Sequence, residues 1–248
     1  MIEKYISDVL VNFTSLGNEP FVKLASKKNF DEISKEKSIT LNQQRRQLEK
    51  FKFFVNAFDF LNDSQIRGDY FEFGCHKGRT FRMVLNAAAF YKIESIKFFA
   101  FDSFEGLPES GDPLIEQWKT GALSTSEDDF LKLVTSLNLY PDDIVTIKGF
   151  YENSLTNELA NKIGSTKASL INVDCDYYDS AVHVFSFVEP FLQHGTVIYL
   201  DDVFAGFKSN SQGGVGQAFE EFTKKTKYKF IPHMNIGWWG RSFITANK

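Results

Sequence analysis

The sequence places three carboxylates where two apolar segments end. Asp174 follows the apolar residues 168–173, and Asp201 and Asp202 follow the apolar residues 196–200. If these segments are neighbouring parallel strands, their carboxyl ends meet at one edge of the sheet, where such sheets bind ligands. Carboxylates that lie so close raise one another's pKa unless a cation or a shared proton separates them. Their oxygens suit Mg²⁺, or else Ca²⁺ or Mn²⁺; the alternative is that they only cap loops or helices.

A second group of residues is the glycine-containing segment 72–80, which follows the first apolar strand. Glycine lets the backbone approach a ligand closely, and the helix that follows offers its N-terminal amides. The dinucleotide fingerprint G-x-G-x-x-G would need a glycine where Glu72 stands. The spacing E-x-G-x-x-x-G of Glu72, Gly74 and Gly78 is instead typical of S-adenosylmethionine sites.

The second expected strand ends at Asp102, within the segment 101–108. A carboxylate at this place in a Rossmann-like sheet can accept hydrogen bonds from both hydroxyls of a ribose. The alternative interpretation is a turn or helix-cap aspartate, which is common.

Strands alternate with helices along most of the chain. A helix is expected from Arg45 to the turn at 63–68, and the later helices are expected at 81–91, 128–137, 155–163, 180–192 and 216–226. The expected strands are 70–73, 96–101, 144–148, 168–173, 196–200, 228–231 and 238–245. This alternation predicts an α/β fold with a mostly parallel sheet covered on both faces, and the last two strands predict an antiparallel hairpin at one edge.

Two further segments have a separate role in this interpretation. Residues 1–45 are expected to form a helical N-terminal arm or lid, in which the polar stretch 26–44 is loop and helix start. The glycine-containing stretch 206–216 comes directly after the aspartate pair, and is either a plain loop or a substrate lid.

The composition excludes several classes of function. A formal net charge of −4 over 248 residues is a poor basis for binding nucleic acid. No apolar run is long enough to span a membrane, and charges interrupt residues 1–16, so we expect neither a membrane segment nor a signal peptide. Two cysteines fit a reducing compartment, which predicts a cytoplasmic protein. The 27 phenylalanines are expected mainly in the core.

These motifs together resemble the macrocin O-methyltransferase family of class I methyltransferases, which modify sugars on natural products. The resembling stretch runs from about Tyr70 to Asp202, and the family's typical D-G-D-L-Y-E-S appears here with Cys175, Tyr177 and Asp179 as mild departures. The separation of 27 positions between Asp174 and Asp201 also matches the family. The motifs that carry the resemblance are segments 72–80, 102–108, 149–151, 174–180 and 201–202.

The resemblance implies a Rossmann-like class I methyltransferase sandwich with a seven-stranded sheet, formed by residues 46–248 as an S-adenosylmethionine-binding domain. Mg²⁺ would be held by Asp174, Asp201 and Asp202, and Asp174 would also be the general base. The acceptor would be a hydroxyl of a sugar or a sugar-containing metabolite, and a homo-oligomer remains open. The implied cofactor-binding residues are Glu72, Gly74, Cys75, Gly78, Thr80, Asp102, Ser103, Gly149, Phe150 and Asp174.

Several alternatives remain at this point. The four histidines, His76, His183, His194 and His233, are rival bases, although each is more often structural; His233 could also line a sugar site with Asn235, Trp238 and Trp239. A catechol-like phenol or a nitrogen could replace the sugar hydroxyl on the same fold. A nicotinamide-dependent oxidoreductase conflicts with Glu72 in the fingerprint, and a non-catalytic scaffold conflicts with retention of all three carboxylates.

Overall fold

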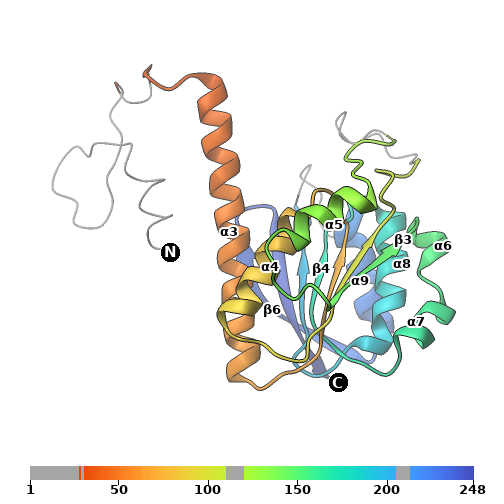
Figure 1. Ribbon diagram of the computed structural model, residues 1–248. Coiled ribbons are helices and arrows are strands. Elements are labelled where there is room, and N and C mark those ends of the chain that lie inside the picture. The colour runs from red at the N-terminus through yellow and green to blue at the C-terminus, as the bar shows by residue number, and fades with distance from the viewer. Residues whose placement is uncertain (1–27, 29–30, 110–119, 205–212) are drawn as a thin grey trace. The chain divides into compact units, whose positions relative to one another are not determined.

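The computed structural model describes Lys28 and residues 31–109, 120–204 and 213–248 (Figure 1). Most of the expected N-terminal arm, and residues 206–212 of the expected lid, lie outside these described residues. The chain divides into two compact units, Met1–Lys52 and Phe53–Lys248, with the boundary inside helix α3 (Lys35–Asp63).

Helix α3 starts at Lys35, ten residues before the Arg45 predicted for it, so the stretch 26–44, which was expected to be loop and helix start, is helical from Lys35 onward. The first residues of the helix are polar and carry no apolar periodicity, but most of them are adequate helix formers. The start is fixed by Ser34, whose hydroxyl accepts a hydrogen bond from the backbone N–H of Lys37 at 3.2 Å.

The second unit contains a seven-stranded sheet with the order β3-β2-β1-β4-β5-β7-β6. Strands β1 to β5 pair in parallel, and β7 pairs antiparallel with both β5 and β6, as predicted. Pro232 lies in the edge strand β6, where its missing N–H is tolerated. The strands are β1 (Asp69–Phe73), β2 (Phe98–Asp102), β3 (Ile144–Lys148), β4 (Ala168–Val173), β5 (Val197–Leu200), β6 (Tyr228–Ile236) and β7 (Gly240–Asn247).

Helices cover both faces of the sheet, and two of them differ from the prediction. The helix expected at 155–163 is observed as α7 (Asn157–Ile163), which starts at Thr156 because the Thr156 hydroxyl accepts a hydrogen bond from the Leu159 N–H, and the short helix α6 (Tyr151–Ser154) before it was not expected. The helix expected to reach 192 ends at Val188, followed by the 3-10 turn Glu189–Phe191 that contains Pro190. The helices of this unit after α3 are α4 (Arg79–Phe90), α5 (Glu127–Thr135), α6 (Tyr151–Ser154), α7 (Asn157–Ile163), α8 (Tyr178–Val188) and α9 (Gly214–Lys225). None of the described helices is both long and apolar enough to cross a membrane.

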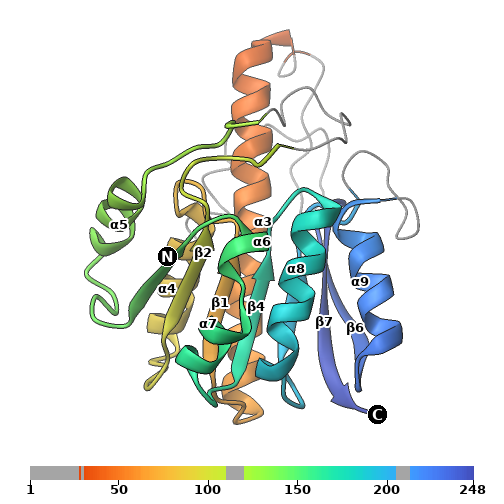
Figure 2. The same cartoon turned by 90° about the vertical axis from the view of Figure 1, so that its right-hand side faces the viewer.

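The two faces of the sheet differ in chemistry. Figure 2 views the face covered by α7, α8 and α9, where an apolar cluster includes Phe71, Phe73 and Phe101. On the opposite face Tyr70 packs against Phe81 of α4 at a ring distance of 5.8 Å. That face also carries buried polar residues in one row across three paired strands, namely Glu72, Asn172 and Tyr199. Each residue of this row is the second-to-last residue of its strand, so the row lies next to the carboxyl edge of the sheet, where the predicted site residues lie.

Candidate active site

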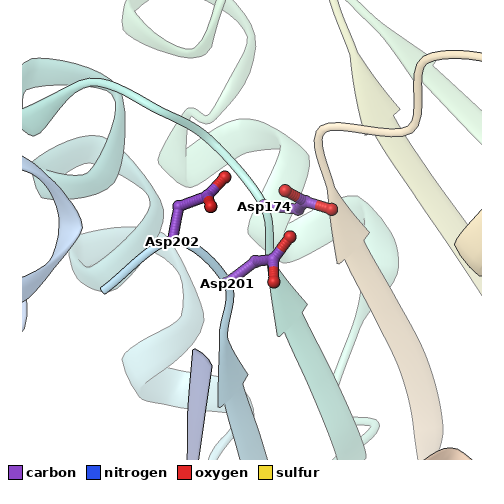
Figure 3. A group of neighbouring side chains, drawn as sticks. All are labelled: Asp174, Asp201 and Asp202. Carbon is purple, nitrogen blue, oxygen red and sulfur yellow. The ribbon is translucent and has the colours of Figure 1, made fainter. Parts of the chain in front are cut away.

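The three predicted metal-binding carboxylates lie together at the carboxyl ends of β4 and β5 (Figure 3). Asp174 follows β4, Asp201 and Asp202 follow β5, and one oxygen from each lies within 4.8 Å of the other two. The convergence expected from the sequence is therefore observed. Metal binding itself remains a prediction, although an all-oxygen group of this size suits Mg²⁺.

Backbone geometry explains how two consecutive aspartates can face the same place. The Asp201 N–H donates to the Val173 carbonyl at 2.9 Å, which continues the pairing of β5 with β4 beyond the last strand residue. Asp202 then has a φ of +52°, the left-handed region that aspartate tolerates better than most residues. The chain turns at this point, and Figure 3 shows the Asp202 carboxylate beside those of Asp201 and Asp174.

Asp201 is 4 % exposed and is held by a group that the sequence reasoning missed. The Tyr199 hydroxyl, two residues earlier on the same strand, donates a hydrogen bond to Asp201 Oδ1. Trp239, from the turn between β6 and β7, makes a side-chain hydrogen bond to Tyr199. Burial, the Asp201 charge and this hydrogen bond raise the pKa of Tyr199, so the phenol stays a donor at neutral pH.

The glycine-containing loop follows β1, and its two glycines are required by close contacts within the protein. Gly74 has a φ of +88°, and a Cβ there would lie 2.0 Å from the Asp174 carbonyl oxygen. Gly78 has a φ of +61° and precedes α4, where a Cβ would lie 2.8 Å from Val134 Cγ1. The first glycine therefore brings the loop against the end of β4, beside the carboxylates.

Asp102 holds this loop through backbone hydrogen bonds. Its Oδ2 accepts from the N–H groups of Cys75 at 2.6 Å and His76 at 3.1 Å, and its Oδ1 accepts from Phe104 at 2.8 Å. A carboxylate has about four acceptor positions, so three of them serve the protein itself. A contact between Asp102 and a ribose remains a prediction. Asp102 would then have two roles, holding the loop and binding the ribose.

The other predicted cofactor residues surround the same edge. Ser103 follows Asp102, and its hydroxyl donates to the Gly106 carbonyl at 2.7 Å. Gly149 and Phe150 follow β3, and the Gly149 N–H donates to the Asp102 carbonyl at 3.0 Å. Thr80 is buried in the first turn of α4.

Glu72 differs from the rest of this group because it is completely buried within β1. Its Oε2 accepts a hydrogen bond from the Tyr70 hydroxyl. Burial and the Glu72 charge raise the pKa of Tyr70. A direct contact between the Glu72 side chain and a cofactor remains a prediction.

Comparison with known proteins decides the family. The family model described as Macrocin-O-methyltransferase (TylF) matches residues 30–243. The chain belongs to the macrocin O-methyltransferase family. It is therefore an S-adenosylmethionine-dependent O-methyltransferase, and the nicotinamide-dependent alternative is wrong.

Solved methyltransferases share the fold of this family member at low identity. The O-methyltransferase NovP is 15 % identical, with 79 % of each chain covered and a TM-score of 0.64. The calicheamicin methyltransferase CalS11 is 13 % identical, with 98 % of this chain and 90 % of that chain covered and a TM-score of 0.65. An apo structure of CalS11, described as a TDP-rhamnose 3′-O-methyltransferase, is also 13 % identical. It covers 98 % of this chain and 92 % of that chain, with a TM-score of 0.56. A sequence search of curated proteins finds no significant match.

The cysteines and histidines of the methyltransferase fit structural roles better than catalytic ones. Cys75 and Cys175 are buried free thiols, and burial raises the pKa of both, which keeps them protonated. His194 precedes β5 and so lies at the edge of the sheet opposite Asp201. His76 ties the glycine loop to the Leu123 carbonyl at 2.5 Å, and burial lowers the pKa of His233.

Proposed function

We propose that this O-methyltransferase transfers the methyl group of S-adenosylmethionine to a hydroxyl of a sugar or a sugar-containing metabolite, with the help of a divalent cation, Mg²⁺. The observation that carries the proposal is the group of Asp174, Asp201 and Asp202, whose oxygens lie within 4.8 Å of one another beside the glycine loop. The description of CalS11 as a TDP-rhamnose 3′-O-methyltransferase supports the sugar as acceptor.

The three carboxylates fit a hard divalent cation. All three offer oxygen, and three protein ligands leave positions of a roughly six-coordinate ion open for an acceptor. A bound cation supplies Lewis-acid chemistry that lowers the pKa of an acceptor hydroxyl and orients it. Asp174 is the proposed general base, because its backbone lies against Gly74 and its carboxylate lies in the group.

The glycine loop and its neighbours hold the methyl donor in this proposal. Gly74, Cys75 and Gly78 bring the backbone and the N-terminus of α4 to the edge of the sheet. The ribose and adenine of the donor would contact residues at the ends of β2 and β3, namely Asp102, Ser103, Gly149 and Phe150. Because the sulfonium is a good leaving group, alignment of the acceptor oxygen with the methyl carbon supplies much of the acceleration.

The proposed partners follow from charge and cysteine chemistry. A net charge of −4 argues for a small-molecule substrate and against nucleic acid. Two buried free thiols are stable in a reducing compartment, which supports a cytoplasmic location. A homo-oligomer remains a prediction, which size-exclusion chromatography with light scattering would test.

The test is an assay of S-adenosylhomocysteine release with nucleoside-diphosphate sugars and, in parallel, with catechols. We expect turnover with a sugar, loss of turnover in excess EDTA, and recovery on adding Mg²⁺. Full turnover in excess EDTA would overturn the metal part of the proposal. Turnover with catechols alone would overturn the sugar part and favour the catechol alternative.

A further inference from the structure

The Tyr199 phenol is buried directly behind the carboxylate group, on the face of the sheet opposite α8. Its exposed fraction is 0 %, and its ring lies 4.8 Å from the Phe53 ring and 6.0 Å from the Phe54 ring. Gly240 on β7 closes the other side, since a Cβ there would lie 2.7 Å from Tyr199 Cε2. The ring has no room to change its position, so the direction of its hydroxyl is set by packing.

The hydroxyl links two parts of the chain that are distant in sequence. It donates to Asp201 Oδ1 and has a side-chain hydrogen bond with Trp239. The indole N–H is a donor only, so in this bond the Tyr199 oxygen is the acceptor. The resulting order is Trp239 to Tyr199 to Asp201, with each group donating to the next.

Trp239 is itself fixed at both its side chain and its backbone. A Cβ at Gly237 would lie 1.9 Å from Trp239 Cζ3, so the turn of the hairpin passes directly over the indole. The Trp239 carbonyl accepts a hydrogen bond from the Phe204 N–H at 3.0 Å. Phe204 is two residues after Asp202, so Trp239 holds the chain on both sides of the aspartate pair.

We propose that Tyr199 is a positioning residue for Asp201 as a metal ligand, and that Trp239 is its anchor. The inference rests on the proposed function, because it assumes that Asp201 binds the cation. With Oδ1 held by the phenol, rotation of the carboxylate is restricted, so its place in the group with Asp174 and Asp202 is fixed. Groups that orient metal ligands in this way typically account for about 10- to 100-fold in metal affinity.

The chain offers a matched control in β1. Tyr70 is also buried and also donates to a carboxylate two residues later on its strand, that of Glu72. Glu72 is not part of the three-carboxylate group. Removing the Tyr70 hydroxyl therefore costs a buried phenol–carboxylate bond of the same kind without touching a proposed metal ligand.

The experiment measures binding of Mg²⁺ alone by calorimetry, and of Mn²⁺ alone by electron paramagnetic resonance, with no turnover. We expect Tyr199→Phe to weaken cation binding roughly 10-fold while its S-adenosylhomocysteine affinity changes less than twofold. Tyr70→Phe should leave cation affinity within about twofold of the unchanged protein. Trp239→Phe, which keeps an aromatic ring but removes the N–H, should weaken cation binding less than Tyr199→Phe.

Four outcomes would overturn the inference, and they are distinguishable. If the unchanged protein binds neither cation, the metal part of the proposed function fails together with this inference. If the unchanged protein binds cations and Tyr199→Phe binds them equally, only the positioning role fails. If Tyr199→Phe and Tyr70→Phe lose equal cation affinity, the effect is general loss of packing. Should Tyr199→Phe not fold by circular dichroism, Trp239→Phe with unchanged cation affinity would overturn the inference instead.

Discussion

The ends of β1 and β5 contain the same local arrangement and lead to different environments. In each strand a buried tyrosine donates to the carboxylate two residues later, Tyr70 to Glu72 and Tyr199 to Asp201. Strand β1 then passes into Gly74, which carries the loop against the end of β4. Strand β5 passes into Asp202, which adds a second carboxylate beside the first. Glu72 is in register with Tyr199 through Asn172, so the β1 pair lies two residues earlier than the β5 pair, and the position of the acid relative to the end of its strand decides between an internal acid and a candidate ligand.

The largest expected effect comes from Asp174, which lies between these two strand ends. We expect Asp174→Asn to lower turnover by about 10²- to 10⁴-fold, since the variant loses the proposed base. It should also weaken Mg²⁺ binding, because one charged ligand is lost. The measurements are steady-state turnover at saturating Mg²⁺ and calorimetry with Mg²⁺ alone.

S-adenosylhomocysteine affinity of this variant is measured alongside, because Asp174 is also an expected cofactor-binding residue. Turnover within tenfold of the unchanged protein would mean that another group is the base. His76 would then be the next residue to substitute, since it lies in the glycine loop.

The comparison of the two acids is sharpened by amide substitutions of equal size. Asp201→Asn should weaken Mg²⁺ binding by at least about 10-fold, the size typical even of changes to groups that only orient ligands. Glu72→Gln should leave Mg²⁺ affinity unchanged, because Glu72 lies inside β1 and outside the carboxylate group. Calorimetry with Mg²⁺ alone separates the two. Equal losses in both variants would contradict the division of roles between β1 and β5.

A smaller effect, on cofactor affinity, is expected at Asp102, which ends β2 and holds the loop that follows β1. Asp102→Ala leaves three backbone N–H groups without their acceptor, so S-adenosylhomocysteine binding should weaken by about 1–3 kcal/mol. Mg²⁺ affinity should stay the same, because Asp102 is not part of the carboxylate group. Both affinities are measured by calorimetry.

The 2′-deoxyribose analogue of S-adenosylhomocysteine separates the two roles of Asp102. If Asp102 also binds the ribose, the unchanged protein should prefer the full ligand, and the variant should lose that preference. If it only holds the loop, both ligands should weaken equally. Unchanged affinity for both ligands would contradict either role.

The sequence predicted the sheet well because its strands are short apolar runs that end in polar or glycine residues. The carboxyl ends of parallel strands share one edge, so the convergence of Asp174 with Asp201 and Asp202 could be predicted from strand order. Tyr199 and Trp239 could not be paired in advance, because their contact depends on how β7 registers against β5. The early start of α3 was missed for a different reason, since a solvent-facing helix start has a cap but no apolar period.

The smallest expected effect concerns Asn172, which lies in register between Glu72 of β1 and Tyr199 of β5. Its exposed fraction is 0 %, and neither amide atom has a hydrogen-bond partner among the described residues. A buried polar group without a partner costs free energy that an apolar side chain of similar shape does not. We therefore expect Asn172→Leu to raise the free energy of unfolding by about 1 kcal/mol, or the melting temperature by roughly 2–4 °C.

The control is Asn172→Ala, which removes the same polar atoms but leaves a cavity, so it should be less stable than Asn172→Leu. Both are measured by thermal unfolding followed with circular dichroism. If Asn172→Leu folds but has a lower melting temperature than the unchanged protein, the amide has a hydrogen-bond partner. That partner would connect Glu72 of β1 with Asp201, which follows β5, across β4. The two strand ends would then act as one polar network, and Asn172→Leu should also weaken Mg²⁺ binding, as Tyr199→Phe is expected to do.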